Sequence, residues 1–163
     1  MRNAIKWILI VVIAITVVIS GKVIKGRKAS NELAQSIFKF DPEHGFVVPI
    51  PQSNARFMGL PMFMAITPAS GNPGRLCNED LERASRALTV LSQCIEIAES
   101  RLVEYSKPDA VTAADIRNPH VWIDGEDEDK TRWAFVVEAK DNDGYAWHIE
   151  FKGAQFHDIW AGS

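Results

Sequence analysis

The chain has 163 residues, of which 47% are hydrophobic and 24% charged. This length allows one globular domain, and this composition excludes disordered, collagen-like and low-complexity proteins. The net charge of −3 is unevenly spread, because residues 1–28 hold six basic and no acidic side chains, whereas the remainder holds twelve basic and twenty-one acidic ones. Such an acidic domain repels a phosphate backbone, which argues against nucleic-acid binding.

The N-terminal segment is predicted to cross a lipid bilayer. Residues 4–24 carry only two charges, Lys6 and Lys22, and as a helix they would extend about 31 Å, enough for a hydrocarbon core of about 30 Å. A signal peptide cleaved after Ser20 is the alternative, but the apolar run continues past that residue. We therefore expect a single-pass membrane protein.

The sequence divides into three predicted parts: a membrane anchor with basic flanks at 1–28, a juxtamembrane stalk at 29–44 and a small globular domain at 45–163. Two basic residues precede the apolar run and four follow it, so the positive-inside rule slightly favours a cytoplasmic domain. Cys77 and Cys94 are expected to remain unpaired, because a helix between them would hold them too far apart for a disulfide. Two free thiols suit a reducing compartment.

The first elements of the domain are predicted to be short edge strands at 46–48 and 62–66, since three prolines interrupt this apolar section. A long helix is predicted at 79–105, with Asn78 as its N-cap, because apolar residues recur at steps of three and four.

The C-terminal third is predicted to be an antiparallel meander with strands at 120–123, 131–140, 145–151 and 154–160. The fold class expected is α+β: a transmembrane helix, then one long amphipathic helix packed on this four-stranded meander.

The predicted register of the meander assigns its side chains to two faces. One face is expected to be buried, because it carries the large apolar residues Phe135, Val137, Trp147, Ile149, Phe151, Phe156 and Trp160. The other face brings Glu138, His148 and His157 into one row. Two imidazoles and a carboxylate make a speculative transition-metal site, although an outward sheet face is more often simply polar.

An acidic loop is predicted between the first two strands of the meander, and it contains Asp124, Glu126, Asp127, Glu128 and Asp129. The loop lacks the alternating ligands and the central glycine of an EF-hand. We interpret it as a contact surface for a partner protein with a basic surface.

No catalytic or cofactor-binding motif occurs in the sequence: G-x-S-x-G, H-E-x-x-H, G-x-G-x-x-G and a phosphate-binding glycine loop are all missing. The methionines Met58, Met62 and Met64 are interpreted as packing residues rather than copper ligands. We therefore expect no cofactor and no enzymatic activity.

The end of the chain, from Trp133 through the last hairpin to Asp158-Ile159-Trp160-Ala161-Gly162, resembles the ends of small α+β domains of bacteria, some of them immunity proteins of toxin–immunity systems. The resemblance implies a non-enzymatic protein that blocks a toxin, and it implies no functional residues. Together with the predicted anchor, it implies a single-pass location in the bacterial inner membrane.

The predicted function is a membrane-anchored protein-binding domain, most concretely an immunity or inhibitor protein. Two alternatives stay open. One is an accessory or scaffolding subunit of a membrane complex that binds through the apolar span and residues 46–66. The other is a metal-dependent hydrolase built on Glu138, His148 and His157.

Overall fold

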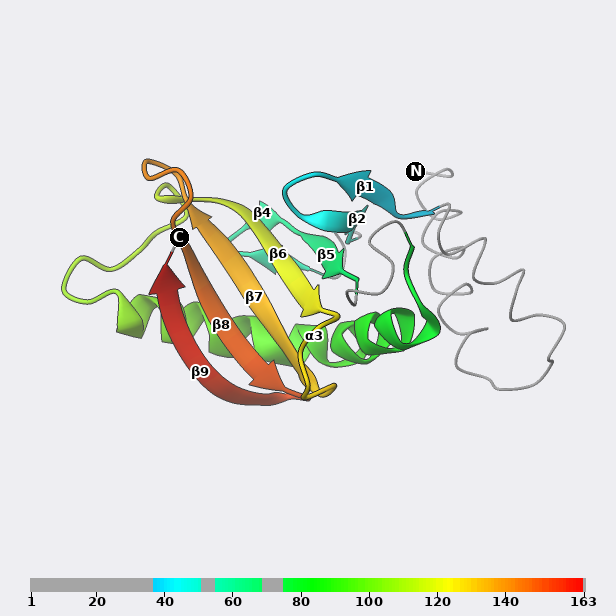
Figure 1. The fold of residues 1–163 in the computed structure, drawn as a ribbon. Helices are drawn as coiled ribbons and strands as arrows, with labels where there is room; N and C mark the ends of the chain where they lie inside the picture. The colour runs from blue at the N-terminus through cyan, green and yellow to red at the C-terminus, as the bar shows by residue number, and fades with distance from the viewer. Residues whose placement is uncertain (1–36, 51–54, 69–74, 163) are drawn as a thin grey trace, which may run out of the picture.

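The computed structural model describes residues 37–50, 55–68 and 75–162, in which a curved sheet of seven strands is crossed on one face by a long helix (Figure 1). A separate two-stranded ribbon lies beside it. The strands of the main sheet are β1 (Lys39–Asp41), β2 (Gly45–Pro49), β5 (Phe63–Thr67), β6 (Ile116–Asp124), β7 (Arg132–Ala139), β8 (Ala146–Lys152) and β9 (Gln155–Gly162). The ribbon consists of β3 (Arg56–Phe57) and β4 (Leu60–Pro61).

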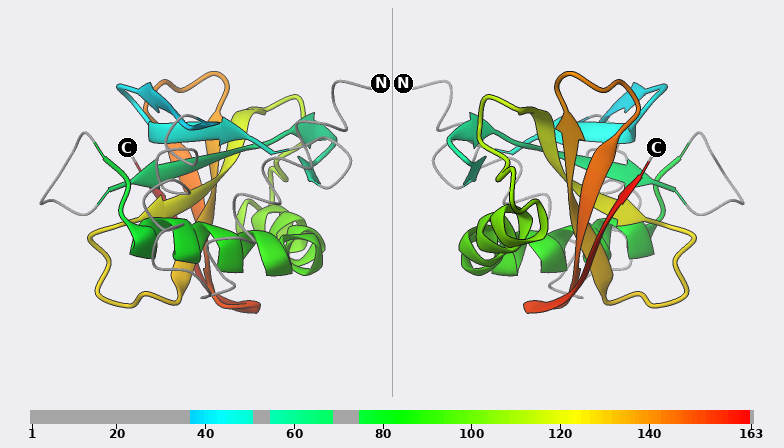
Figure 2. Two further views of the ribbon diagram at one scale, coloured as in Figure 1. Left: turned by 90° about the vertical axis from the view of Figure 1, so that its right-hand side faces the viewer. Right: turned by 90° about the vertical axis from the view of Figure 1, so that its left-hand side faces the viewer.

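The strand order in the main sheet is β1-β2-β5-β6-β7-β8-β9, and all neighbours are antiparallel except β5 and β6. These two are parallel because the chain between them crosses back over the sheet as helix α3 (Asn78–Tyr105). Figure 2 shows the twist of the sheet and the helix on one side of it. We call the opposite side of the sheet its outer face.

Helix α3 begins one residue earlier than the sequence suggests. Cys77, not Asn78, is the N-cap, and its backbone N–H donates to Asp80 Oδ2 at 2.8 Å. Asp80 thus accepts one of the amide hydrogens that a helix start leaves unsatisfied. The predicted apolar stripe is confirmed where it meets the sheet, since Leu81, Leu91 and Leu102 are buried.

The core lies between α3 and the side chains that alternate toward it along the strands. Phe135, Val137, Ile149 and Phe151 are fully buried, as the alternation of the sequence predicts. The section before the helix contributes to the same core, for example through Met64. The free state predicted for Cys77 and Cys94 is also confirmed.

The predicted architecture is wrong in the extent of its sheet. A four-stranded meander is present as β6–β9, but β5, β2 and β1 extend it to seven strands, so the described domain is mostly sheet. The prolines of this section led to an expectation of edge strands, whereas β5 is an interior strand, paired with both β2 and β6. Residues 39–41, expected in a stalk, form β1 instead.

The membrane assignment also needs correction. No helix in the part of the chain that the structure describes is long and apolar enough to cross a membrane. The predicted anchor at 1–28 and its bilayer contact at 4–24 lie outside the described residues. The expected single-pass location in the bacterial inner membrane therefore has no support in the structure.

Candidate functional site

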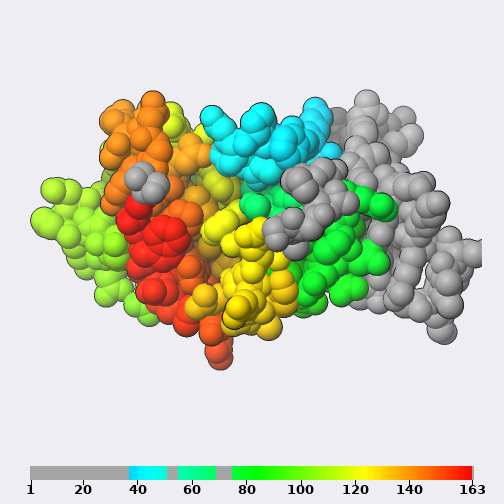
Figure 3. Space-filling model, viewed as in Figure 1, coloured from blue at the N-terminus to red at the C-terminus, as the bar shows by residue number. Residues whose placement is uncertain are grey.

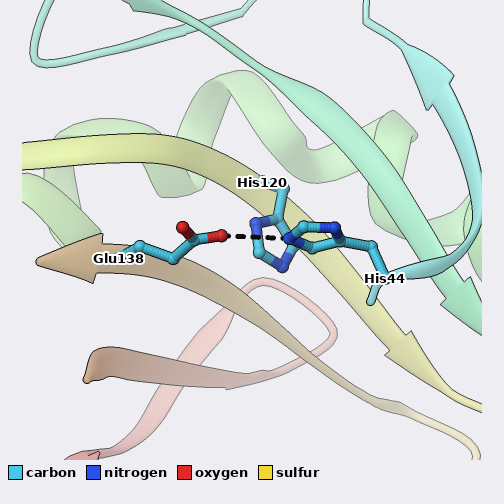
Figure 4. Close-up of side chains that lie close together, drawn as sticks. All are labelled: His44, His120 and Glu138. Atoms are coloured by element: carbon cyan, nitrogen blue, oxygen red, sulfur yellow. Dashed lines mark hydrogen bonds and ion pairs between the residues drawn. The ribbon is translucent and has the colours of Figure 1, made fainter. Parts of the chain in front are cut away.

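A cluster of polar side chains lies on the outer face of the sheet, where His44, His120 and Glu138 point toward one another (Figure 4). His44 lies in the turn between β1 and β2, His120 is on β6, and Glu138 is near the end of β7. One nitrogen or oxygen atom from each residue lies within 4.8 Å of the others.

A bulge in β6 orients two members of this cluster. The register against β7 shifts between Arg117 and His120, and Asn118 has a φ of +48°. Asparagine is one of the residues that adopt this left-handed conformation most readily. In the bulge, the backbone carbonyl oxygen of Asn118 accepts from His120 Nδ1 at 2.8 Å. The side-chain Nδ2 of Asn118 donates to Glu138 Oε2 at 3.0 Å.

Glu138 is held from one side by these donors. Arg117 Nε donates to the same Oε2 at 3.1 Å, and Arg117 Nη2 forms an ion pair with Asp143 at 2.6 Å. The other carboxylate oxygen, Oε1, faces His44 Nε2 at 3.0 Å. Glu138 thus presents one oxygen to the cluster.

The turn that carries His44 is fixed by Asp41 and Gly45. Asp41 Oδ1 accepts from the backbone N–H of Glu43 and from the backbone and Nδ1 of His44, at 2.9–3.0 Å. Gly45 has a φ of +76°, and a Cβ there would lie 2.6 Å from the carbonyl oxygen of Ile66 on β5. Only glycine allows this approach, which brings His44 close to Glu138 although β5 and β6 lie between their strands.

The two histidines differ in protonation. Burial lowers the pKa of His120 to about 4, so its ring is neutral at pH 7, with the hydrogen on Nδ1 toward Asn118. Burial opposes the charged form of His44 as well, but hydrogen bonds to Glu138 and Asp41 raise its pKa overall. Carboxylates only accept hydrogen bonds, so His44 bridges Asp41 and Glu138 as an imidazolium.

A second feature of the outer face is a pocket of about 340 Å³ between Trp122 on β6 and Trp160 on β9. The small side chain of Ala134 lies between them in the sheet and leaves the space open. Three carboxylates and one guanidinium contribute to the lining: Asp124, Asp127, Glu150 and Arg132. Figure 3 shows this face, with β9 (red) and the segment around β6 (yellow) on either side of β7 and β8 (orange).

The two tryptophans are held in place by their neighbours. Trp160 stacks on His148 with ring centroids 3.8 Å apart, and its Nε1 donates to Glu150 Oε1 at 2.9 Å. Trp122 Nε1 donates to Thr67 Oγ1 at 3.0 Å. Trp160 nevertheless remains 40% exposed, so an apolar surface is open to solvent beside the carboxylates.

The acidic loop beside the pocket is anchored from helix α3. The buried Arg83 donates to the carbonyl oxygens of Asp124 and Arg132, which are the last residue of β6 and the first of β7. Within the loop, Asp124 and Asp127 each accept a backbone N–H two residues on. The loop is therefore shaped by its own hydrogen bonds and by the helix.

The structure divides the five predicted contact residues of this loop. Asp124 and Asp127 line the pocket. Asp129 instead stabilises the hairpin, because it accepts hydrogen bonds from Thr131 and forms an ion pair with Lys152. These contacts lower the pKa of Asp129 to about 2. Glu126 and Glu128 lie outside the pocket lining.

The predicted metal row is not the cluster that the structure shows. Glu138 belongs to the cluster, but His148 stacks on Trp160 and His157 accepts from Arg132 Nη2 at 2.7 Å. The cause is the register: Glu138 pairs with Ala146, and His148 pairs with Trp160. A bulge in β9 at His157 moves Trp160 from the expected buried face to the outer face.

Sequence reasoning missed His44, His120 and the pocket. A usable signal for the first two was present, because Asn118-Pro119 inside a strand indicates a bulge and Pro42-Glu43-His44-Gly45 indicates a turn. Nothing in the sequence indicated that these two segments meet. A comparison of the chain with protein-family models, curated proteins and solved structures finds no match.

Proposed function

We propose that this domain binds another protein and that the pocket between Trp122 and Trp160 receives an arginine side chain from a basic surface of that partner. The observation that carries the proposal is the combination of an open pocket, a lining that includes Trp122, Trp160 and the buried Trp133, and three lining carboxylates. Arginine and tryptophan are the residues most often found at energetically dominant positions of interfaces.

The chemistry of the pocket favours arginine over other occupants. A planar guanidinium packs against aromatic rings and pairs with carboxylates through two parallel hydrogen bonds. Glu150 is already oriented by the Trp160 indole through Oε1, which leaves Oε2 to accept from a ligand. Arg132 lowers the negative charge of the lining, but its Nη2 is directed to His157. A lysine would have one compact charge and would use the aromatic walls less well.

The anchored loop supports binding without large rearrangement. Arg83 fixes both ends of the loop, and Lys130 Nζ donates to the Gly125 carbonyl within it at 3.0 Å. A loop that is already ordered loses less conformational entropy when a partner binds. The acidic domain also attracts a basic partner over a distance, which speeds association.

An inhibitor or immunity protein is the most concrete form of this function, since such proteins bind a toxin surface without catalysing a reaction. The accessory-subunit alternative has less structural support. Its proposed contact surface includes four residues that are buried in the core: Phe46, Val48, Met64 and Ile66. The hydrolase alternative loses its proposed residues, since His148 and His157 have other partners.

The test is chromatography of the full chain on matrices that carry arginine, lysine or citrulline. Citrulline has the shape of arginine without its charge. We expect retention on arginine to exceed retention on lysine, and no retention on citrulline. The changes Trp160→Ala, Glu150→Gln and Asp127→Asn should each reduce retention on arginine.

Matched variants separate the pocket from general charge attraction. Glu128→Gln and Asp158→Asn each remove one negative charge away from the lining, and both should keep the retention of the unmodified chain. Equal losses in pocket and control variants, or equal retention on lysine and arginine, would show that the acidic domain behaves as a simple ion exchanger and would refute the pocket.

A further inference from the structure

We propose that His44, His120 and Glu138 bind one divalent transition metal ion of the zinc type. This site is separate from the arginine pocket and goes beyond the protein-binding function. It uses side chains from three segments, the β1–β2 turn, β6 and β7, that meet on the outer face of the sheet (Figure 4).

The donor set selects the class of metal. Two imidazoles and one carboxylate suit Zn²⁺, Fe²⁺ or Co²⁺, whereas Ca²⁺ and Mg²⁺ prefer oxygen ligands throughout. The ligand atoms lie within 4.8 Å of one another, with His44 Nε2 and Glu138 Oε1 at 3.0 Å. Tetrahedral ligands at about 2.0–2.2 Å from a zinc ion lie about 3.3–3.6 Å from one another. The His44–Glu138 pair therefore opens slightly, and the widest separation closes by no more than about 1.5 Å.

Each of the three residues already has the supporting hydrogen bond that metal ligands usually have. Asp41 accepts from Nδ1 of His44, which leaves Nε2 directed at the cluster. The Asn118 carbonyl accepts from Nδ1 of His120 and leaves the lone pair of this neutral ring on Nε2. Asn118 and Arg117 hold Oε2 of Glu138 and leave Oε1 to the cluster.

Metal binding exchanges a proton for the ion. Between His44 Nε2 and Glu138 Oε1 the metal-free protein holds one proton, which leaves to solvent when the ion takes its place. The His44–Asp41 bond is kept. Three protein ligands leave at least one coordination position to water, as in open zinc sites.

A neighbouring group of acids is a weaker candidate. Asp41, Glu43 and His44 also lie within reach of one another. However, Asp41 Oδ1 already accepts from two backbone N–H groups and from His44, and Glu43 is exposed. These bonds shape the turn, so Asp41 supports His44 rather than binding the ion.

The experiment measures zinc affinity of the full chain, made metal-free with EDTA, in competition with a chromophoric zinc indicator. The exposed Cys77 is changed to serine in every sample, because a free thiol is itself a zinc ligand. We expect one zinc per chain. His44→Gln, His120→Gln and Glu138→Gln should each weaken binding about tenfold or more.

Two matched controls come from the same chain. His157→Gln and Glu126→Gln remove exposed groups of the same kinds elsewhere and should leave zinc affinity unchanged. His120 is buried, so if its variant does not fold by circular dichroism, His44→Gln and Glu138→Gln decide alone.

Absence of stoichiometric binding, unchanged affinity in His44→Gln and Glu138→Gln, or an equal loss in His157→Gln would each overturn the proposal. As a spectroscopic check, Co²⁺ bound at this site should show the intense visible absorption of a low-coordinate nitrogen and oxygen site. The same absorption in His44→Gln would count against it.

Discussion

The two faces of the sheet are built in different ways. The face toward α3 is uniformly apolar, and its fully buried side chains come from successive strands that follow a regular alternation, as with Phe135 and Ile149. The outer face depends on two bulges, in β6 and β9, and on the turn that carries His44. Irregular backbone thus occurs where polar and aromatic side chains gather.

This difference indicates that one face determines the fold and the other provides the binding groups. The apolar face gains stability from every side chain that it removes from water. The outer face keeps a buried neutral histidine beside a charged ion pair and leaves Trp160 40% exposed. Such groups contribute little to folding and are available for a ligand.

The largest expected effect is on the apolar face. Phe135→Ala removes a fully buried ring and should lower the free energy of unfolding by about 3–5 kcal/mol. Trp160→Ala, on the outer face, should lower it by about 1 kcal/mol or less but reduce retention on arginine. Denaturant unfolding measures the first effect. Similar losses of stability in both variants would contradict the division between the faces.

A smaller effect is expected at the turn that carries His44. Gly45→Ala combines a left-handed φ with a Cβ 2.6 Å from the Ile66 carbonyl oxygen, and we expect a loss of about 3 kcal/mol together with weaker zinc binding. Gly144→Ala is the control, because Gly144 has a φ of +81° but open space around it, so the loss should be about 1 kcal/mol and zinc binding should persist. Equal losses in the two variants would show that the contact with β5 does not fix the turn.

The sequence predicts the elements whose signals are local. Apolar steps of three and four residues mark α3, and the alternation around Phe135, Val137, Ile149 and Phe151 marks the core face of the meander. The parallel pairing of β5 with β6 is not predictable in this way, because these strands are joined only through α3 and nothing local specifies which edge of the meander β5 joins.

The sites were harder to predict because they depend on register and on distant segments. The predicted register between β7 and β8 is wrong by two residues, but a shift of two keeps every side chain on the same face of the sheet. The prediction of which residues of these strands face the core therefore remains correct. The bulge at His157 moves the residues after it to the opposite face of the sheet, so the predicted position of Trp160 on the buried face was wrong. His44 and Glu138 are 94 residues apart, and only the folded sheet brings them together.

The most direct test of the arginine pocket is the nuclear magnetic resonance spectrum of the tryptophan side chains during titration with a glycyl-arginyl-glycine amide. Trp122 and Trp160 line the pocket together with the buried Trp133, whereas Trp147 pairs with Val137 on the face toward α3. We predict saturable shifts of the Trp122 and Trp160 indole N–H signals and no shift of the Trp147 signal. The same peptide with citrulline in place of arginine should shift none of these signals. Equal shifts of the Trp122, Trp160 and Trp147 signals, or no shift of any of them, would contradict an arginine-binding pocket on the outer face.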